Sequence, residues 1–131
     1  MTPTNFEMVK EFHKSFNLPV PDEITMQDID TISLRLKLIY EELNELHNEF
    51  SPKGNFYIKT VAKEIADLLY VTYGFAATLG IPINQVFEEV HKSNMTKLGD
   101  DGKPVYRDDG KVLKSKNYLP PNLNSVLGLD K

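Results

Sequence analysis

The chain of 131 residues contains no cysteine. This absence excludes a disulfide framework, a thiolate metal site and a cysteine nucleophile, so any catalysis must rest on oxygen and nitrogen groups. The first twelve residues also lack the charged and then apolar layout of a secretory signal. We therefore expect a cytoplasmic protein.

Residues 68–87 carry no charge, and a stretch of that length raises the question of a membrane span. The stretch contains Gly74, Gly80 and Pro82 together with several polar side chains. We interpret it as a buried core helix followed by its exit turn, and we expect no membrane contact.

An excess of positive charge is also missing. The 15 lysine and arginine residues are outnumbered by 19 aspartate and glutamate residues, which gives a net charge of −4. Binding to a nucleic-acid polymer is therefore disfavoured, because phosphate contacts need clustered basic side chains. Residues 1–90 hold 7 basic and 14 acidic side chains, whereas residues 91–131 hold 8 and 5. The acids are thus concentrated in the body of the chain.

Length and an ordinary content of 40% hydrophobic and 26% charged residues predict one globular domain over residues 1–131. Thr4 and Glu7 have the spacing of a capping box, which predicts a helix over about 5–16. Thr25 with Asp28 is a second candidate cap, for a long amphipathic helix that ends at about residue 50. Apolar periodicity then predicts helices over about 56–79, buried on nearly every side, and about 83–98.

The last third of the chain has a different pattern. Asp109 and Gly110 lie between the short apolar segments 103–106 and 111–113, which predicts a β-hairpin. From Tyr118 onward we expect an extended tail. The predicted fold is therefore all-α: a four-to-five-helix antiparallel bundle core over about 5–98, with a small C-terminal β-hairpin and extended tail over about 99–131.

Acidic residues in two of the predicted helices form paired patterns. Those of the second helix share one sector, roughly 100° wide, that borders the apolar stripe; they are Glu41, Glu42, Glu45 and Glu49. Glu64 and Asp67 stand three apart on one face of the apolar third helix, where a carboxylate needs a partner. A short turn at 51–55 makes the two helices antiparallel neighbours and can bring the two sets together.

Four or five carboxylates that face one another form a site for a hard cation. All-oxygen ligation suits Mg²⁺, with Mn²⁺ as a substitute. Ions held there could bridge a polyphosphate and activate a water molecule. Glu41, which is the most offset from the apolar side, is our candidate for the outer acid that accepts the proton of the water. The alternative is a solvated acidic face without a ligand.

The two acidic pairs resemble the signature of the all-α nucleoside triphosphate pyrophosphatases. This superfamily includes the MazG proteins, the dimeric dUTPases and the phosphoribosyl-ATP pyrophosphohydrolases. The resemblance extends to further segments and is strongest to the MazG-like subgroup of bacteria and phages; these segments are Leu34-Arg35, residues 67–71, residues 91–97 and residues 109–114.

The resemblance implies Mg²⁺-dependent cleavage of a (deoxy)nucleoside triphosphate, dUTP-like, dCTP-like or non-standard, to the monophosphate and pyrophosphate by water attack on the α-phosphorus. It implies a homodimer or a dimer of dimers. It also implies a set of site residues: Glu42, Glu45, Glu64 and Asp67 as metal ligands, Glu41 as the outer acid, Lys97 on phosphate and Asn94 on sugar or base. Further candidates for outer phosphate contacts are Lys92, Lys111 and Lys114.

Two other functions fit the sequence less closely. One is a non-enzymatic helical interaction or regulatory module, in which the acids only keep the protein soluble. The other is a metal-storage protein that has no need of Lys97. For Arg35 we expect a structural ion pair with an acid such as Asp28 or Glu64, and we expect the three histidines to be packing or surface residues.

Overall fold

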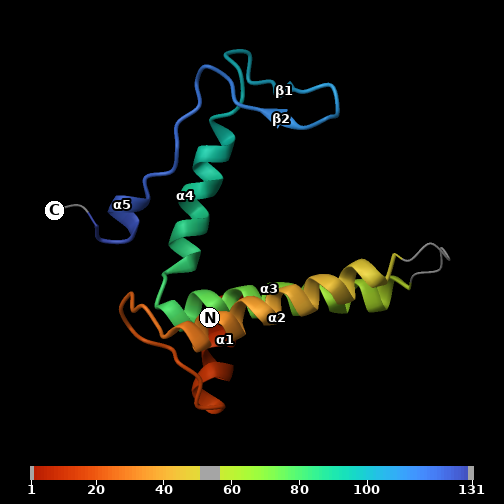
Figure 1. Cartoon of the computed structure of the whole chain (residues 1–131). Coiled ribbons are helices and arrows are strands. Elements are labelled where there is room, and N and C mark those ends of the chain that lie inside the picture. The colour runs from red at the N-terminus through yellow and green to blue at the C-terminus, as the bar shows by residue number, and fades with distance from the viewer. Residues whose placement is uncertain (1, 51–56, 130–131) are drawn as a thin grey trace. The chain divides into compact units, whose positions relative to one another are not determined.

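The computed structural model describes residues 2–50 and 57–129 (Figure 1). It is mostly helical with one small hairpin near the C-terminus, which confirms the predicted all-α class. By internal contacts the chain forms two compact units, the first ending at Ile81 and the second beginning at Pro82. The elements are α1 (Asn5–Ser15), α2 (Ile29–Asn48), α3 (Ile58–Leu79), α4 (Ile83–Met95), β1 (Val105–Tyr106), β2 (Val112–Leu113) and α5 (Leu123–Val126).

Helix α1 begins with the predicted capping box. The Thr4 hydroxyl accepts a hydrogen bond from the Glu7 amide at 3.1 Å, and the Thr4 amide donates to Glu7 Oε1 at 3.2 Å. The helix packs across α3 through Phe6 and Val9, which are buried, and the Phe6 ring lies 6.1 Å from that of Tyr73. Its apolar face therefore covers one side of α3.

Helix α2 begins later than a cap at Thr25 would place it. Its N-cap is Asp28, whose Oδ1 accepts a hydrogen bond from the Thr31 amide at 2.8 Å. The prediction of Thr25 as a cap is wrong, because its amide donates to the Leu79 carbonyl instead and its hydroxyl donates to the Glu23 carbonyl, each at 2.9 Å. These contacts attach the segment before α2 to the end of α3.

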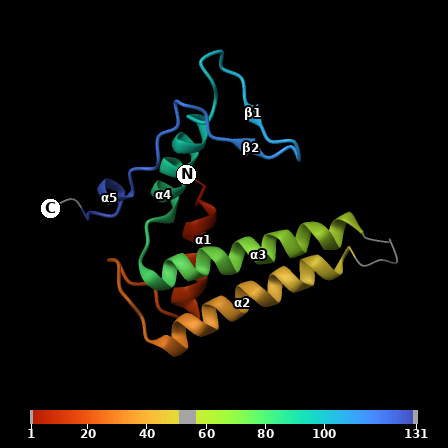
Figure 2. The ribbon, with the colours of Figure 1, turned by 45° about the horizontal axis from the view of Figure 1, so that its top comes forward.

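Helix α3 is central, since it contacts both α1 and α2, and it runs antiparallel beside α2 (Figure 2). It ends, as predicted, at Gly80, which has φ 68°. The prediction that it is buried on nearly every side is wrong for the isolated chain. Ile65 and Leu69 remain 45% and 51% exposed, because two helices cover only part of its surface.

The turn predicted at 51–55 lies outside the described residues. Over the ranges that the structure does describe, no single helix is both long and apolar enough to cross a membrane. Helices α3 and α4 pass such a test only when they are counted together as a bent pair, by length and composition alone.

The second unit contains α4, the hairpin and α5. Strands β1 and β2 are antiparallel, with Val105 opposite Leu113, and the predicted hairpin is confirmed. Helix α4 ends at Met95, three residues earlier than predicted, and Thr96 follows it as the C-cap. The tail is not wholly extended as predicted, because the Asn122 side chain accepts a hydrogen bond from the Ser125 amide at 3.3 Å and starts the one-turn helix α5. That residues 1–131 form one domain stays a prediction.

Candidate metal centre

Four acidic side chains meet between α2 and α3. Glu42 and Glu45 come from α2, and Glu64 and Asp67 come from α3; one oxygen from each lies within 4.8 Å of all the others. Each pair has an i, i+3 spacing, so both members face the same side of their helix. Opposite ligands of an octahedral Mg²⁺ are about 4.2 Å apart, since each sits about 2.1 Å from the ion. The 4.8 Å limit is slightly wider than this distance, so a small movement of the side chains would let the four oxygens surround one hard cation.

Burial within this acidic cluster leaves two carboxylate oxygens without partners. Glu64 is only 8% exposed. Its Oε2 atom, and that of Glu42, are buried without a hydrogen-bond partner in the structure. Buried polar atoms are normally paired, and a buried charge is costly unless a counter-charge lies beside it. A cation between the four acids would give both oxygens a partner.

The electrostatics of the acidic cluster favour the same conclusion. Burial is the largest cause that raises the pKa of Glu42 above its usual value, and the nearby charges of Glu45 and Asp67 raise it further. The pKa of Glu64 is also raised, first by burial and then by its hydrogen bond with Glu45. Both shifts mean that the ionised, ligand-ready form is disfavoured in the metal-free protein. A bound cation would reverse that penalty.

One lysine contacts the acidic cluster, and the sequence analysis missed it. Lys63 Nζ lies 2.6 Å from Asp67 Oδ2, and the lysine side chain is 68% exposed. No other ion pair to the four acids occurs within the described parts of the chain. The signal was available in the sequence, because residues 63 and 67 are four apart on one helix face.

Of the other predicted site residues, only Glu41 belongs to the same unit as the four acids. Glu41 is exposed on α2 and is not part of the group of oxygens. Asn94 and Lys92 are exposed on α4, where Lys92 lies 3.6 Å from Glu89. Lys97 follows α4, two residues after its last residue Met95, and is half-buried. The last three residues belong to the second unit, and their contact with a substrate stays a prediction.

Arg35 does not form the predicted ion pair with Asp28 or Glu64. It is 6% exposed, and its Nε atom has no partner in the structure. It lies beside His13, whose Nδ1 is 3.0 Å from the Pro19 carbonyl, and both side chains approach Gly74. A Cβ atom on Gly74 would come within 3.0 Å of His13 Nε2 and 3.4 Å of Arg35 Nη1. Glycine here makes room for two buried basic side chains.

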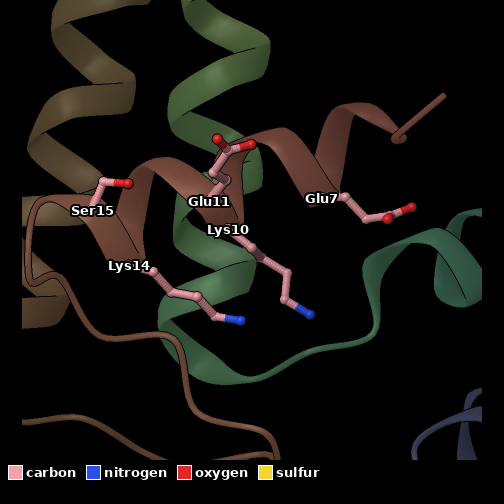
Figure 3. Close-up of a pocket in the computed structure, with 5 residues that line it drawn as sticks. All are labelled: Glu7, Lys10, Glu11, Lys14 and Ser15. Atoms are coloured by element: carbon pink, nitrogen blue, oxygen red, sulfur yellow. The ribbon is translucent and has the colours of Figure 1, made fainter.

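Two surface depressions elsewhere in the first unit lack such convergence. One is an apolar groove between α1 and α3, lined mainly by Met8, Val9, Leu69, Tyr70 and Tyr73. The other lies on α1, where the side chains of Lys10 and Lys14 point to one side while Glu11 points to the other (Figure 3). The first depression is mostly apolar, and the second is lined by polar side chains of α1 alone, so neither brings acidic side chains of two helices together.

Comparison with known proteins identifies the family. The model of the phosphoribosyl-ATP pyrophosphohydrolase family matches residues 9–94, which include all four clustered acids. The chain belongs to this family. Membership in the phosphoribosyl-ATP pyrophosphohydrolase family confirms the resemblance to the all-α nucleoside triphosphate pyrophosphatases. The matched residues end before Lys97, the hairpin and α5.

One curated protein similar to this chain is viral. It is the uncharacterized protein L479 of Acanthamoeba polyphaga mimivirus. It is 28% identical over 116 residues, which cover 86% of this chain and 43% of the relative. The chain therefore spans less than half the length of that relative. The fold is that of a nucleotide pyrophosphohydrolase, and the finer assignment depends on the site.

Proposed function

We propose that the protein is a nucleoside triphosphate pyrophosphohydrolase that uses Mg²⁺, or Mn²⁺ in its place. The observation that carries this proposal is the convergence of four carboxylates from α2 and α3, with buried oxygens of Glu42 and Glu64 left unpartnered, in a member of a pyrophosphohydrolase family. The predicted substrate is a dUTP-like, dCTP-like or non-standard nucleotide.

The four acids are proposed to hold the cation, and they fit that role by chemistry as well as by position. Carboxylate oxygens are the ligands that Mg²⁺ and Mn²⁺ prefer. Divalent ions bound there supply Lewis-acid chemistry, which polarises phosphoryl oxygens and strengthens water as a nucleophile. Glu45 and Asp67 are more accessible than Glu64, so the side of the acidic cluster that they form is open to a substrate.

The proposed reaction is a hydrolysis. The oxygen of a water molecule forms a bond to the α-phosphorus, and the bond from that phosphorus to the oxygen bridging it to the β-phosphorus breaks. The bridging oxygen leaves with the electron pair as part of pyrophosphate, and the other product is the monophosphate. Glu41 takes the proton of the water in this proposal, because it adjoins Glu42 and its exposed carboxylate is outside the four-oxygen group.

The remaining groups are assigned to the substrate. Lys97 and Lys92 would contact phosphate, and Asn94 would contact the sugar or the base. All three come from the second unit, which lies in the more basic part of the chain. Glu41 and these residues are the positions where substitution should alter catalysis or KM without removing the cation.

We also propose a homodimer or a dimer of dimers. Few apolar side chains are fully buried among the described residues; they are Phe6, Val9, Val61, Ala76 and Ala77. Large apolar side chains on α2 and α3 stay exposed, Tyr40 at 66%, Leu43 at 47% and Leu69 at 51%. A second copy of the chain that packs on these helix faces would cover the exposed apolar side chains.

The decisive experiment measures pyrophosphate release from a panel of deoxynucleoside and modified triphosphates, with Mg²⁺, with Mn²⁺ and with EDTA. We expect metal-dependent release, and a loss of at least about 100-fold in Glu42→Gln and Asp67→Asn, since ligand removal disables the site. Glu49→Gln, on the same helix stripe but outside the group of four oxygens, is the matched control and should retain activity.

The alternatives give different results in the same panel. A non-enzymatic helical module would release no pyrophosphate and would show no Mg²⁺-dependent rise in Tm. A metal-storage protein would gain stability from the cation yet leave every triphosphate intact. Activity that persists in Glu42→Gln and Asp67→Asn would reject the proposed site.

A further inference from the structure

Among the described residues of the first unit, Lys63 forms an ion pair with the acidic cluster. Its Nζ lies 2.6 Å from Oδ2 of Asp67, whose carboxylate is one of the four proposed to bind the metal. The lysine precedes the acid by four residues, which is the less favourable order for such a pair on a helix, and its side chain is 68% exposed. An exposed pair in this order contributes little to stability. The position of Lys63 beside the carboxylate of a proposed metal ligand is therefore more informative than the strength of the ion pair.

We propose that Lys63 competes with the divalent cation for Asp67 and, once displaced, binds a phosphate of the substrate. The proposal rests on the proposed function above, and it adds a residue that lies outside the predicted set. An ammonium group and a divalent ion on the same carboxylate repel each other. Binding of the divalent ion to Asp67 therefore weakens the contact between Lys63 and Asp67.

The chemistry of lysine makes a phosphate its natural next partner. Its ammonium is a compact charge with three donors on a flexible stem, so it can turn from Asp67 toward an anion beside it. A polyphosphate held at the acidic cluster would be the nearest uncompensated negative charge. Cation and polyphosphate should then bind cooperatively, because the polyphosphate gives the displaced Lys63 a new partner, and such coupling is reciprocal.

Helix α3 also provides a matched control. Lys59 lies one turn before Lys63 and is likewise exposed, but none of the ion pairs found in the described chain joins it to the four acids. Removing Lys59 makes the same change in net charge on the same helix. A general electrostatic effect on cation binding would therefore appear in both variants, whereas direct competition would appear only at Lys63.

The test is calorimetric titration of the full chain with Mg²⁺ alone, then with Mg²⁺ in the presence of inorganic pyrophosphate. Without pyrophosphate, Lys63→Met should bind Mg²⁺ about two- to fivefold more tightly than the wild type, the range expected for loss of an exposed pair. With pyrophosphate, the gain in Mg²⁺ affinity should be at least about fivefold smaller in Lys63→Met. Lys63→Arg should resemble the wild type, and Lys59→Met should change neither quantity.

Three results would overturn the proposal. If Lys63→Met binds Mg²⁺ no more tightly than the wild type, or if Lys59→Met gains as much Mg²⁺ affinity as Lys63→Met, then Lys63 does not compete with the cation for Asp67. An unchanged pyrophosphate effect in Lys63→Met removes the phosphate contact. Both measurements are made without hydrolysis, so they test this proposal separately from the catalytic one. If the protein cleaves triphosphates but Lys63→Met binds Mg²⁺ like the wild type, the proposed function stands and the role of Lys63 is rejected. If Lys63→Met shows the expected changes but the protein cleaves no triphosphate, the role of Lys63 stands and the proposed function is rejected.

Discussion

Glu64 is the least exposed of the four clustered acids, and one of its oxygens has no hydrogen-bond partner in the structure. This single side chain links the stability of the folded protein to the binding of the proposed cation. Its pKa is raised by burial, so the folded protein holds the proton of Glu64 more tightly than the unfolded chain does. Ionisation of Glu64 in the metal-free protein therefore favours unfolding as pH rises above about 4.5.

The first prediction concerns Glu64→Gln, which keeps the shape of the side chain and removes its charge. In EDTA at neutral pH the variant should have a higher Tm than the wild type, and this difference should disappear well below pH 4.5, where Glu64 is protonated in both states. Addition of Mg²⁺ should raise the Tm of the wild type and not that of the variant. Differential scanning calorimetry measures the Tm in EDTA at neutral pH, its dependence on pH and its response to Mg²⁺. A variant less stable than the wild type in EDTA would contradict the account.

His13 gives a second prediction, with the opposite sign of pH dependence. Burial lowers its pKa, and the nearby charge of Arg35 lowers it further, although the Pro19 carbonyl opposes both effects. Since a carbonyl oxygen only accepts, the neutral ring carries its proton on Nδ1. The unfolded chain binds a proton more readily, so stability should fall as pH drops below about 6.5. Urea unfolding between pH 5 and pH 8 measures this slope.

The matched variants for that slope are His13→Gln and His91→Gln. The first removes the buried titrating group, so its stability should depend less on pH over this range even if it is lower throughout. The second changes an exposed histidine and should leave the slope of the wild type in place. An identical slope in all three proteins would show that another group is responsible.

The residues of the acidic cluster were predictable because their positions follow from helical spacing. Glu42, Glu45, Glu64 and Asp67 needed only two periodic helices and a short connection between them. Arg35 was not predictable, since its surroundings depend on Gly74 and His13, which lie far from it in sequence. The spacing of residues along one helix predicts which face of the helix they share. It does not predict which distant segments of the chain pack on that face or how much space they leave for its side chains.

At the scale of elements, local signals succeeded where no distant group competed with them. The Thr4 capping box and the Gly80 terminus are both as predicted. Thr25 failed as a cap because the Leu79 carbonyl, more than fifty residues away, takes its amide. Helix α4 ended early because Thr96 donates to the Ser93 carbonyl at 2.6 Å and accepts from the Leu119 amide at 2.8 Å. The contacts with Leu79 and Leu119 are tertiary, and a local pattern does not contain them.

The third prediction concerns the end of α3. Gly80 has φ 68°, and a Cβ atom there would lie 2.1 Å from the Glu23 carbonyl oxygen. Gly80→Ala should therefore lower the free energy of unfolding by more than about 2 kcal/mol, since a left-handed alanine costs about 1–2 kcal/mol before any clash. Gly110→Ala, at φ 87° with nothing within 4 Å, should cost only about 1 kcal/mol. Chemical denaturation compares the two, and equal losses would contradict the clash.

At the scale of the whole molecule, the sequence predicted an apolar core that one chain does not complete. The apolar periodicity of α3 was recognised correctly, but periodicity does not say whether the covering surface comes from the same chain. Among the described helices of the first unit, α1 and α2 pack on α3, and Leu69 stays 51% exposed. The second copy of the chain proposed above would cover such side chains.

The fourth prediction follows from this exposed surface. Size-exclusion chromatography with light scattering should give the mass of a dimer or tetramer at micromolar concentration. Leu43→Lys, which places a charge on the exposed apolar face of α2, should shift the protein toward the monomer. Met26→Lys is the control, because Met26 is 79% exposed and precedes α2. A wild type that elutes only as a monomer would contradict the proposed assembly.

The attachment of α2 to α3 at one end has a consequence for local opening. Gln27 Nε2 donates to the Thr78 carbonyl at 2.9 Å, the Thr25 amide donates to the Leu79 carbonyl, and Thr78 itself is fully buried. Amide hydrogen exchange should therefore be slowest near Thr78 and faster around Glu64, where repelling carboxylates favour transient opening. Cation binding should slow exchange around Glu64 and leave Thr78 nearly unchanged. The ion concentration would then set the opening free energy of one end of the helix pair independently of the other.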